Sequence, residues 1–229
     1  MKVVSFLFFL FVFSRGVPAQ EASVLLEKVK AKYNSVKDYE AEARMKTNVV
    51  FIKAPVAGIK VYYKNPDKLK IRNESGISFI PRGSVNISMS NVFTMDSYTA
   101  IDGGTETIKG KTTRVIKVLP DDGASEVVLS TLYIDEESLL VLKSKTTTRE
   151  NGTYELEMEY GKYASYGLPD KLKFTFNTRD YKLPKGVTFD YDPGTGKEAE
   201  EKMKDKKGTI EISYSSYSIN KGISDEVFK

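Results

Sequence analysis

A long run of alternating side chains constrains the fold of this chain more than any other feature. From Tyr39 to Phe51, apolar or small residues occupy the odd positions, and charged or polar residues occupy nearly all the even ones. Because successive side chains of a strand point to opposite faces, this pattern predicts a long antiparallel strand with one buried and one solvated face. We expect no other segment to be long enough to pair with as many neighbours, and we interpret it as the first strand of a strongly curved sheet.

Shorter alternating runs follow along the rest of the chain. A turn at Asn65–Asp67 joins two of them into a hairpin, and Glu150–Gly152 joins two more, since Asn-Gly between alternating segments is a strong hairpin signal. After Gly103–Gly104 the strand signals become regular. The runs predict about nine to eleven strands with short turns, that is, a mainly β protein whose antiparallel sheet curls on itself.

One amphipathic helix precedes the sheet. Apolar residues recur at helical spacing from Leu25 to Val36, with lysines and glutamates between them. We expect the helix to begin near Ala22 and to end near Asn34–Ser35. Because a helix with a single apolar face needs an apolar partner, it should lie against the open face of the sheet.

Residues 1–19 carry the features of a secretory signal. Lys2 precedes an apolar run from Val3 to Phe13, and Val17 and Ala19 occupy the small-residue positions before a cleavage site. The run is too short to span a bilayer. We therefore expect a signal peptide at 1–19, a single domain at 20–229, and a soluble protein exported to a bacterial periplasm.

The absence of cysteine and the distribution of charge exclude several classes of protein. The chain has no cysteine, which excludes disulfides and the acylated cysteine of a bacterial lipoprotein. Loss of the signal lowers the formal net charge from +4 to +2, because the signal contains Lys2 and Arg15 and no acid. Basic and acidic residues are interspersed, whereas nucleic-acid binding needs a basic patch, so we expect no nucleic-acid partner.

Two segments are open to more than one interpretation. The segment 76–102 has apolar residues without a clean period, Phe93 and Met95 among them, and fits either a core edge or an apolar flap that meets ligands. The segment 190–207 is rich in charge and predicts a short solvated helix, either as a plain exposed insertion or as a docking site.

The sequence contains few of the residue types that common catalytic sites use. The chain has no histidine and no cysteine, which removes Ser-His-Asp and Cys-His arrangements and the usual zinc ligands. Acidic groups occur at Asp121–Asp122 and at Asp135–Glu137, but both lie at expected turns, where acids are ordinary. We expect neither an enzyme nor a cofactor or metal site.

The apolar face of the sheet is the remaining candidate. A curled sheet of this length has more inward positions than one helix readily covers, and an apolar cavity binds apolar ligands. The same pattern would also arise from an interior filled by its own side chains. The pattern alone does not separate these two alternatives.

The order of several short motifs resembles a known family. The motifs are Tyr33–Lys37 at the helix end, Val61–Lys70 around the first turn, Tyr133–Asp135 at a strand end and Asn220–Phe228 at the close. Together they are similar to the LolA-like outer-membrane lipoprotein-sorting proteins. The resemblance implies an unclosed half-barrel with a helical or loop lid over the opening, and an apolar cavity that shelters the acyl chains of lipoproteins crossing the periplasm.

The resemblance also implies ligands, partners and cavity residues. It implies lipidated protein or lipid acyl chains bound by a monomer, with inner- and outer-membrane transfer proteins as candidate partners. A related domain occurs in envelope-stress sensors, so the alternative is a non-enzymatic sensor or adaptor that binds a protein partner. In the family's carriers a basic residue before the turn proline helps hold the lid shut, and here that position is Asn65. The cavity residues implied are Met45, Val49, Phe51, Val61, Tyr63, Leu69, Ile71, Leu156, Met158, Phe174 and Phe176, with Phe93 and Met95 in the flap.

Overall fold

The computed structural model describes residues 18–48, 56–73, 90–93, 95, 97–150, 152–177 and 207–228. The strands are β1 (Asp38–Asn48), β2 (Ala57–Lys64), β3 (Lys68–Asn73), β4 (Tyr98–Ile108), β5 (Lys111–Pro120), β6 (Val127–Asp135), β7 (Leu140–Thr148), β8 (Thr153–Glu159), β9 (Lys171–Asn177) and β10 (Lys207–Ile219). The helices are α1 (Pro18–Asn34) and α2 (Ser90–Phe93), with the short 3-10 helices η1 (Ala164–Tyr166) and η2 (Asp225–Phe228).

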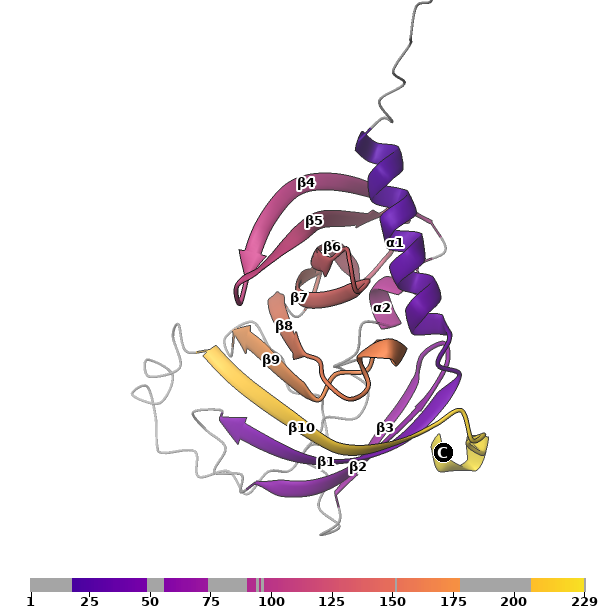
Figure 1. Cartoon of the computed structure of the whole chain (residues 1–229). Coiled ribbons are helices and arrows are strands. Elements are labelled where there is room, and N and C mark those ends of the chain that lie inside the picture. Colours follow the sequence, from indigo (N-terminus) through magenta and orange to yellow (C-terminus); the bar gives the residue numbers. More distant parts are fainter. Residues whose placement is uncertain are drawn as a thin grey trace, which may run out of the picture.

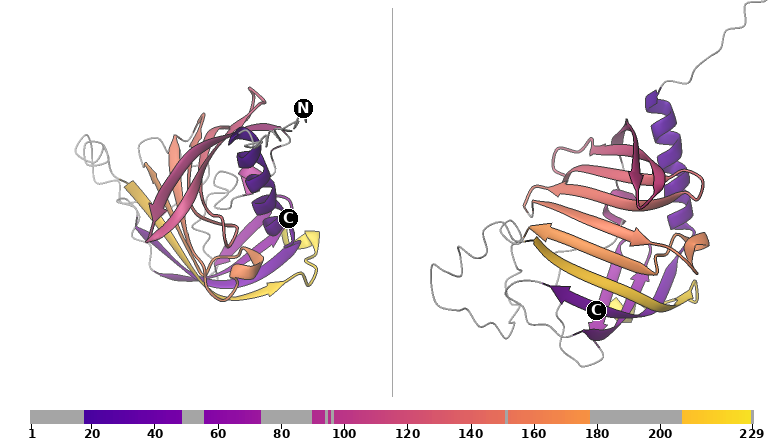
Figure 2. Two further views of the ribbon diagram at one scale, coloured as in Figure 1. Left: turned by 45° about the horizontal axis from the view of Figure 1, so that its top comes forward. Right: turned by 60° about the vertical axis from the view of Figure 1, so that its left-hand side comes forward.

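The strands form one 10-stranded antiparallel sheet in the order β3-β2-β1-β10-β9-β8-β7-β6-β5-β4. β1–β3 and β4–β9 are two meanders, and β10 joins them by pairing with β9 on one side and β1 on the other. The sheet curls strongly, and among the described strands its edges, β3 and β4, do not pair with each other (Figures 1 and 2). The predicted fold class, an unclosed half-barrel of antiparallel strands, is confirmed.

β1 lies in the interior of the sheet, as its alternating pattern predicts. Ala41, Ala43 and Met45 are buried on the concave side, and the even-numbered residues from Glu42 to Lys46 are exposed. Pairing with β2 and β10 satisfies both edges of the strand. The expectation that no other segment is long enough to pair with as many neighbours is wrong, because β10 has 13 residues and also pairs with two strands.

α1 lies across the opening of the half-barrel (Figures 1 and 2). Its buried residues Ala22, Leu26 and Val29 face the sheet, and the helix contacts β4. The helix begins at Pro18, before the predicted start, because proline has no N–H to leave unsatisfied in the first turn. It ends at Asn34, as predicted.

Gly103 and Gly104 lie inside β4, which begins at Tyr98, before the pair. The register of β4 against β5 shifts between Asp102 and Thr105, which accommodates both glycines in a bulge. Gly104 has a φ of +83°, and a Cβ at Gly103 would come within 3.0 Å of the Val115 side chain. Glycine fits both positions, and the pair bends the strand without ending it.

Parts of the predictions fall outside the described residues. These parts are the signal run Val3–Phe13, the strand end at 49–51, the flap segment up to residue 89 and the charged segment from 190 to 206. The end of the flap segment is described. There α2 carries Phe93, which is 5% exposed and belongs to the core.

Candidate functional site

The concave side of the sheet carries apolar side chains in two clusters. The first, called here the α1 cluster, contains buried residues of α1, α2 and β4–β9. The second, called the β1 cluster, contains buried residues of β1, β2 and β10 together with Val36 and Leu168. Ile210 and Tyr214 of β10 pack against both clusters. The two clusters therefore meet at β10.

The predicted cavity residues that the structure describes are divided between these clusters. Those in or against the α1 cluster are Phe93, Met95, Leu156, Met158, Phe174 and Phe176. Those in or against the β1 cluster are Met45, Val61, Tyr63, Leu69 and Ile71. Val49 and Phe51 lie outside the described residues.

Strand register aligns part of the α1 cluster into a row. Leu156 of β8 is opposite Phe174 of β9, which is opposite Ile210 of β10. The next pair on the same face of β8 and β9 is Tyr154 and Phe176, and the rings of Phe174 and Phe176 are 5.2 Å apart. Neighbouring strands are about 4.8 Å apart, so the row forms a continuous apolar stripe across several strands.

Helices contribute to the cover of this row. Leu26 and Val29 of α1 and Phe93 of α2 belong to the same cluster. Leu156 and Phe174 are each only 1% exposed. These two side chains of the row are therefore enclosed by the surrounding core.

Hydrogen bonds hold the last turn of α1. The hydroxyls of Tyr33 and Tyr160 are 2.7 Å apart, and Tyr160 also donates to the Val141 carbonyl at 2.9 Å. Lys32 Nζ donates to the Ser138 carbonyl at 2.7 Å. Burial raises the pKa of Tyr33 to about 12, against the opposing effect of its hydrogen bond with Tyr160. Tyr33 therefore stays neutral well above neutral pH, and its contact with Tyr160 persists.

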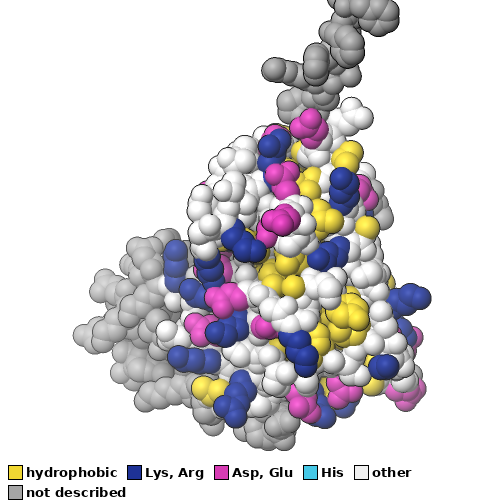
Figure 3. Space-filling model, in the orientation of Figure 1, with side chains coloured by type: hydrophobic (Ala, Val, Ile, Leu, Met, Phe, Trp, Pro, Cys, Tyr) yellow, Lys and Arg dark blue, Asp and Glu magenta, His cyan; other side chains and the backbone are white. Residues whose placement is uncertain are grey.

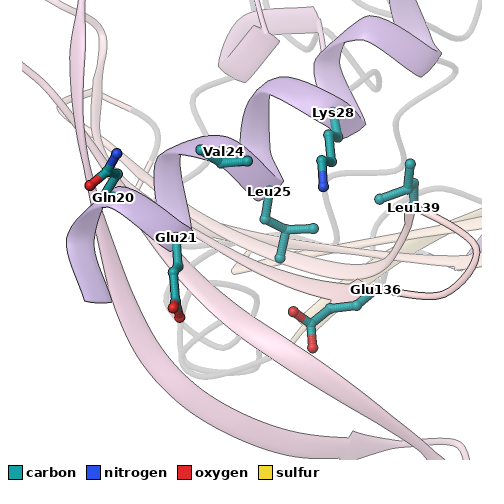
Figure 4. A pocket seen from close by; sticks show the side chains of 7 residues that line it. All are labelled: Gln20, Glu21, Val24, Leu25, Lys28, Glu136 and Leu139. Carbon is teal, nitrogen blue, oxygen red and sulfur yellow. The ribbon is translucent and has the colours of Figure 1, made fainter. Parts of the chain in front are cut away.

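A pocket lies between α1 and the turn that joins β6 to β7 (Figure 4). Its volume is about 520 Å³, and its lining residues are Gln20, Glu21, Val24, Leu25, Lys28, Glu136 and Leu139. Leu25 belongs to the α1 cluster and Leu139 packs against it, so the pocket borders that cluster. In the space-filling view, hydrophobic side chains form a band beside α1 with charged residues on its flanks (Figure 3).

None of the predicted cavity residues lines this pocket. The sequence did not predict this pocket, because the pocket lies between α1 and a turn that is more than 100 residues away along the chain. The apolar periodicity of α1 identifies Leu25, but nothing local connects Leu25 with Leu139.

A tyrosine cluster is the second feature that sequence reasoning missed. It consists of Tyr39, Tyr63, Tyr163, Tyr214 and Tyr217. The Tyr217 ring lies 5.2 Å from Tyr39, 4.9 Å from Tyr163 and 5.0 Å from Tyr214. Tyr63 stacks on Tyr39 at 5.2 Å. Alternation marks Tyr39, Tyr63 and Tyr214 as inward positions, but the curl of the sheet is what brings them together.

Asn65 occupies the position that the resemblance assigns to a basic lid residue. Its side-chain amide donates to Oδ1 of Asn34, the last residue of α1, at 3.4 Å. Lys64 points elsewhere, since its Nζ donates to Asp225 at 2.8 Å. The hydrogen bonds of Lys64 and Lys68 hold the pKa of Asp225 below its ordinary value. The contact with α1 at this position is therefore a neutral hydrogen bond.

The acidic turn after β6 has a structural role. Although burial opposes it, hydrogen bonds from Lys111 and Ser138 hold the pKa of Asp135 below its ordinary value. Within the described ranges, no group of three or more acidic, histidine or cysteine side chains is placed to hold a metal ion. In the same part of the chain, no helix has both the length and the hydropathy that a membrane span requires.

An unclosed antiparallel sheet, a helix across its opening and an apolar concave side define the LolA-like fold. A DUF1329 family protein from Desulfovibrio piger superposes with a TM-score of 0.57 at 14% identity, over 93% of this chain and 97% of its own. A LolA superfamily protein from Nitrosomonas europaea gives 0.57 at 10% identity, over 93% and 98%. A domain named for outer membrane lipoprotein sorting from Vibrio parahaemolyticus gives 0.56 at 11%, over 92% and 97%.

These similarities confirm the fold expected from the resemblance. No protein-family model and no curated protein matches the chain.

Proposed function

We propose that the protein is a carrier that binds the acyl chains of lipids or lipidated proteins on the concave side of its sheet and releases them unchanged. The observation that carries this proposal is the row from Leu156 through Phe174 to Ile210, which is apolar and lies beneath a helix. The names of two similar structures, one for lipoprotein sorting and one for the LolA superfamily, support the choice of ligand.

The energetics suit reversible binding. Each methylene group removed from water contributes roughly 0.8 kcal/mol, so a chain of about 16 carbons gains on the order of 10 kcal/mol. Moving α1 away uncovers Leu26 and Val29, and each such side chain costs about 1.5–3 kcal/mol when it returns to water. The cost of exposing the α1 side chains offsets part of the free energy gained by burying the acyl chain. The remaining affinity is small enough for transfer to an acceptor. No covalent step and no cofactor are needed.

The proposal includes the cellular setting that the sequence predicts. The signal at 1–19 directs the single domain at 20–229 to the periplasm, where inner- and outer-membrane transfer proteins act as donor and acceptor. There the protein works as a monomer.

Native mass spectrometry of the purified protein tests the proposal. The protein is measured alone, and then with a palmitoylated lipoprotein peptide or the same peptide without its acyl chain. We expect a co-purified lipid or selective retention of the acylated peptide. A ligand-free mass with no preference for the acylated form would contradict the carrier function and favour a sensor or adaptor that binds a protein partner.

A further inference from the structure

The hydroxyl groups of Tyr39 and Tyr214 distinguish these residues from the rest of the tyrosine cluster. Tyr217 donates to the Pro169 carbonyl at 2.7 Å, and Tyr63 donates to the Pro66 carbonyl at 3.3 Å. Neither Tyr39 nor Tyr214 has a hydrogen-bond partner for its hydroxyl in the described part of the chain. The rings of Tyr39 and Tyr214 both contact the Tyr217 ring, so the two hydroxyls belong to one cluster and can donate to a ligand.

Both hydroxyls are enclosed but remain within reach of a ligand. Burial is the main cause that raises the pKa of Tyr39 and of Tyr214. Yet the fully buried side-chain oxygens without a partner, among the described residues, are those of Ser138 and Ser144. The Tyr39 and Tyr214 hydroxyls are therefore not fully buried and remain open to hydrogen bonding from outside the protein. As neutral phenols they offer O–H donors at any physiological pH.

The charges around the tyrosine cluster favour a neutral acceptor. The Asp170 and Asp67 carboxylates help to raise the pKa of Tyr217 and of Tyr63, after the larger effect of burial. Their negative potential opposes a carboxylate or phosphate ligand at the same place. A cation, Lys162, contacts the Tyr163 ring at 5.1 Å, but its side chain is exposed. A carbonyl oxygen suits two phenol donors in this setting.

The position of Tyr214 connects this polar point to the apolar row. Tyr214 and Ile210 lie on β10 and pack against both clusters, and Ile210 is opposite Phe174. A molecule with its carbonyl at Tyr214 can thus extend its hydrocarbon chain past Ile210 toward Phe174.

We propose that Tyr39 and Tyr214 bind the carbonyl oxygen of an acyl ester or amide and so fix the orientation of the ligand. The polar linkage lies at the tyrosine cluster, and the alkyl chain lies along the row of the α1 cluster. This inference rests on the proposed carrier function and adds to it a polar anchor and a direction. Acyl esters of glycerol and acylated peptides share the required carbonyl.

Matched Tyr→Phe variants test the inference. Tyr39→Phe, Tyr214→Phe and the double variant remove the hydroxyls and keep the rings, and Tyr62→Phe on the convex side of β2 is the control. Binding of methyl palmitate, monopalmitoylglycerol, a palmitoylated peptide and heptadecane is measured by displacement of a fluorescent fatty-acyl reporter. Heptadecane has a comparable chain and no carbonyl.

We expect the double variant to bind the three carbonyl compounds about tenfold more weakly, with heptadecane and the Tyr62→Phe control unchanged. Equal loss for heptadecane, or no loss for any carbonyl compound, would overturn the polar anchor and leave the carrier function standing. Loss for only the glycerol ester or only the peptide would support the anchor and identify the source of the ligand. If the unmodified protein binds none of the four, the carrier function is wrong and the anchor with it.

Discussion

The side chains of Asp38 and Asn220 form reciprocal hydrogen bonds with the backbone beside the other residue, at the junction between α1 and the sheet. The Asp38 carboxylate accepts hydrogen bonds from the backbone N–H groups of Lys221 at 3.1 Å and Gly222 at 3.0 Å. The Asn220 side chain accepts from the backbone N–H of Lys37 at 2.7 Å and donates to the Ser35 carbonyl at 3.2 Å. The pair thus joins the start of β1 to the end of β10, next to the end of α1.

Loss of the Asn220 side chain should loosen this junction. Asn220 has a φ of 55°, which glycine also adopts readily, so Asn220→Gly removes the side-chain bonds without straining the backbone. We expect the free energy of unfolding to fall by about 1–2 kcal/mol and the amides of residues 35–38 to exchange faster. Urea denaturation and hydrogen exchange measure both effects, and Lys221→Ala, an exposed change next to it, is the control. Unchanged exchange at 35–38 would contradict the role of the pair.

A charge on the concave side should abolish ligand binding. Met158→Glu and Phe174→Glu place a carboxylate among apolar side chains that are 4% and 1% exposed. An unpaired charge there is strongly unfavourable beside an alkyl chain. Glu157→Gln on the convex side of β8 is the matched control, since it changes charge without touching the row. Equal effects of the two kinds of change on binding of the palmitoylated peptide would count heavily against the concave site.

A buried glutamate also threatens the fold, so a milder variant accompanies these changes. Phe174→Ala should keep the circular dichroism spectrum of the sheet, cost about 3–5 kcal/mol of stability and weaken binding several-fold. Normal binding of the palmitoylated peptide by a folded Phe174→Ala protein would show that the acyl chain does not lie against Phe174.

Alkaline pH should destabilise the protein over a defined range. Burial raises the pKa of Tyr33 to about 12, whereas an unfolded tyrosine titrates near pH 10. The unfolded chain therefore loses its proton first, and the stabilising contribution is complete below about pH 10 and lost as the pH rises toward 12. Urea midpoints recorded with tyrosinate absorbance should fall over that interval, and Tyr33→Phe should make the fall shallower. Full tyrosinate formation near pH 10 in the folded protein would refute the enclosed state of these rings.

Movement of α1 on ligand binding can be followed with a single fluorophore. The chain has no tryptophan, and Val24 lines the pocket between α1 and the β6–β7 turn while remaining 47% exposed. We expect the emission of a Val24→Trp variant to shift when the palmitoylated peptide binds, because the helix moves relative to Leu139. Val128→Trp, which replaces a similarly exposed valine on β6, should not respond. A constant Val24→Trp spectrum at saturating peptide would mean that the ligand enters without moving α1.

The sequence predicted the buried face of single strands better than it predicted contacts between segments that are distant along the chain. Alternation gave the inward side of β1, β2, β8 and β9, because each strand reports its own buried face through side chains such as Met45 and Phe174. It did not show that Gly103 and Gly104 would be accommodated within β4, since a bulge depends on the partner strand. It also missed the pocket between Leu25 and Leu139 and the contact of Tyr39 with Tyr217. Such contacts depend on the curl of the whole sheet and leave no periodic signal in any one segment.

The pairing of β1 with β10 sets an order for folding. Tyr39 is opposite Ile219, whereas the other neighbouring strands of the sheet are adjacent along the chain or nearly so. Contacts between distant residues carry a large loop-closure entropy and form slowly. During synthesis, β4–β9 can assemble hairpin by hairpin, but one edge of β1 waits for the last strand. Before β10 is synthesised, we expect the chain to expose the unpaired edge of β1 and its apolar residues Ala41, Ala43 and Met45. The nascent chain is therefore most prone to aggregate just before β10 pairs with β1.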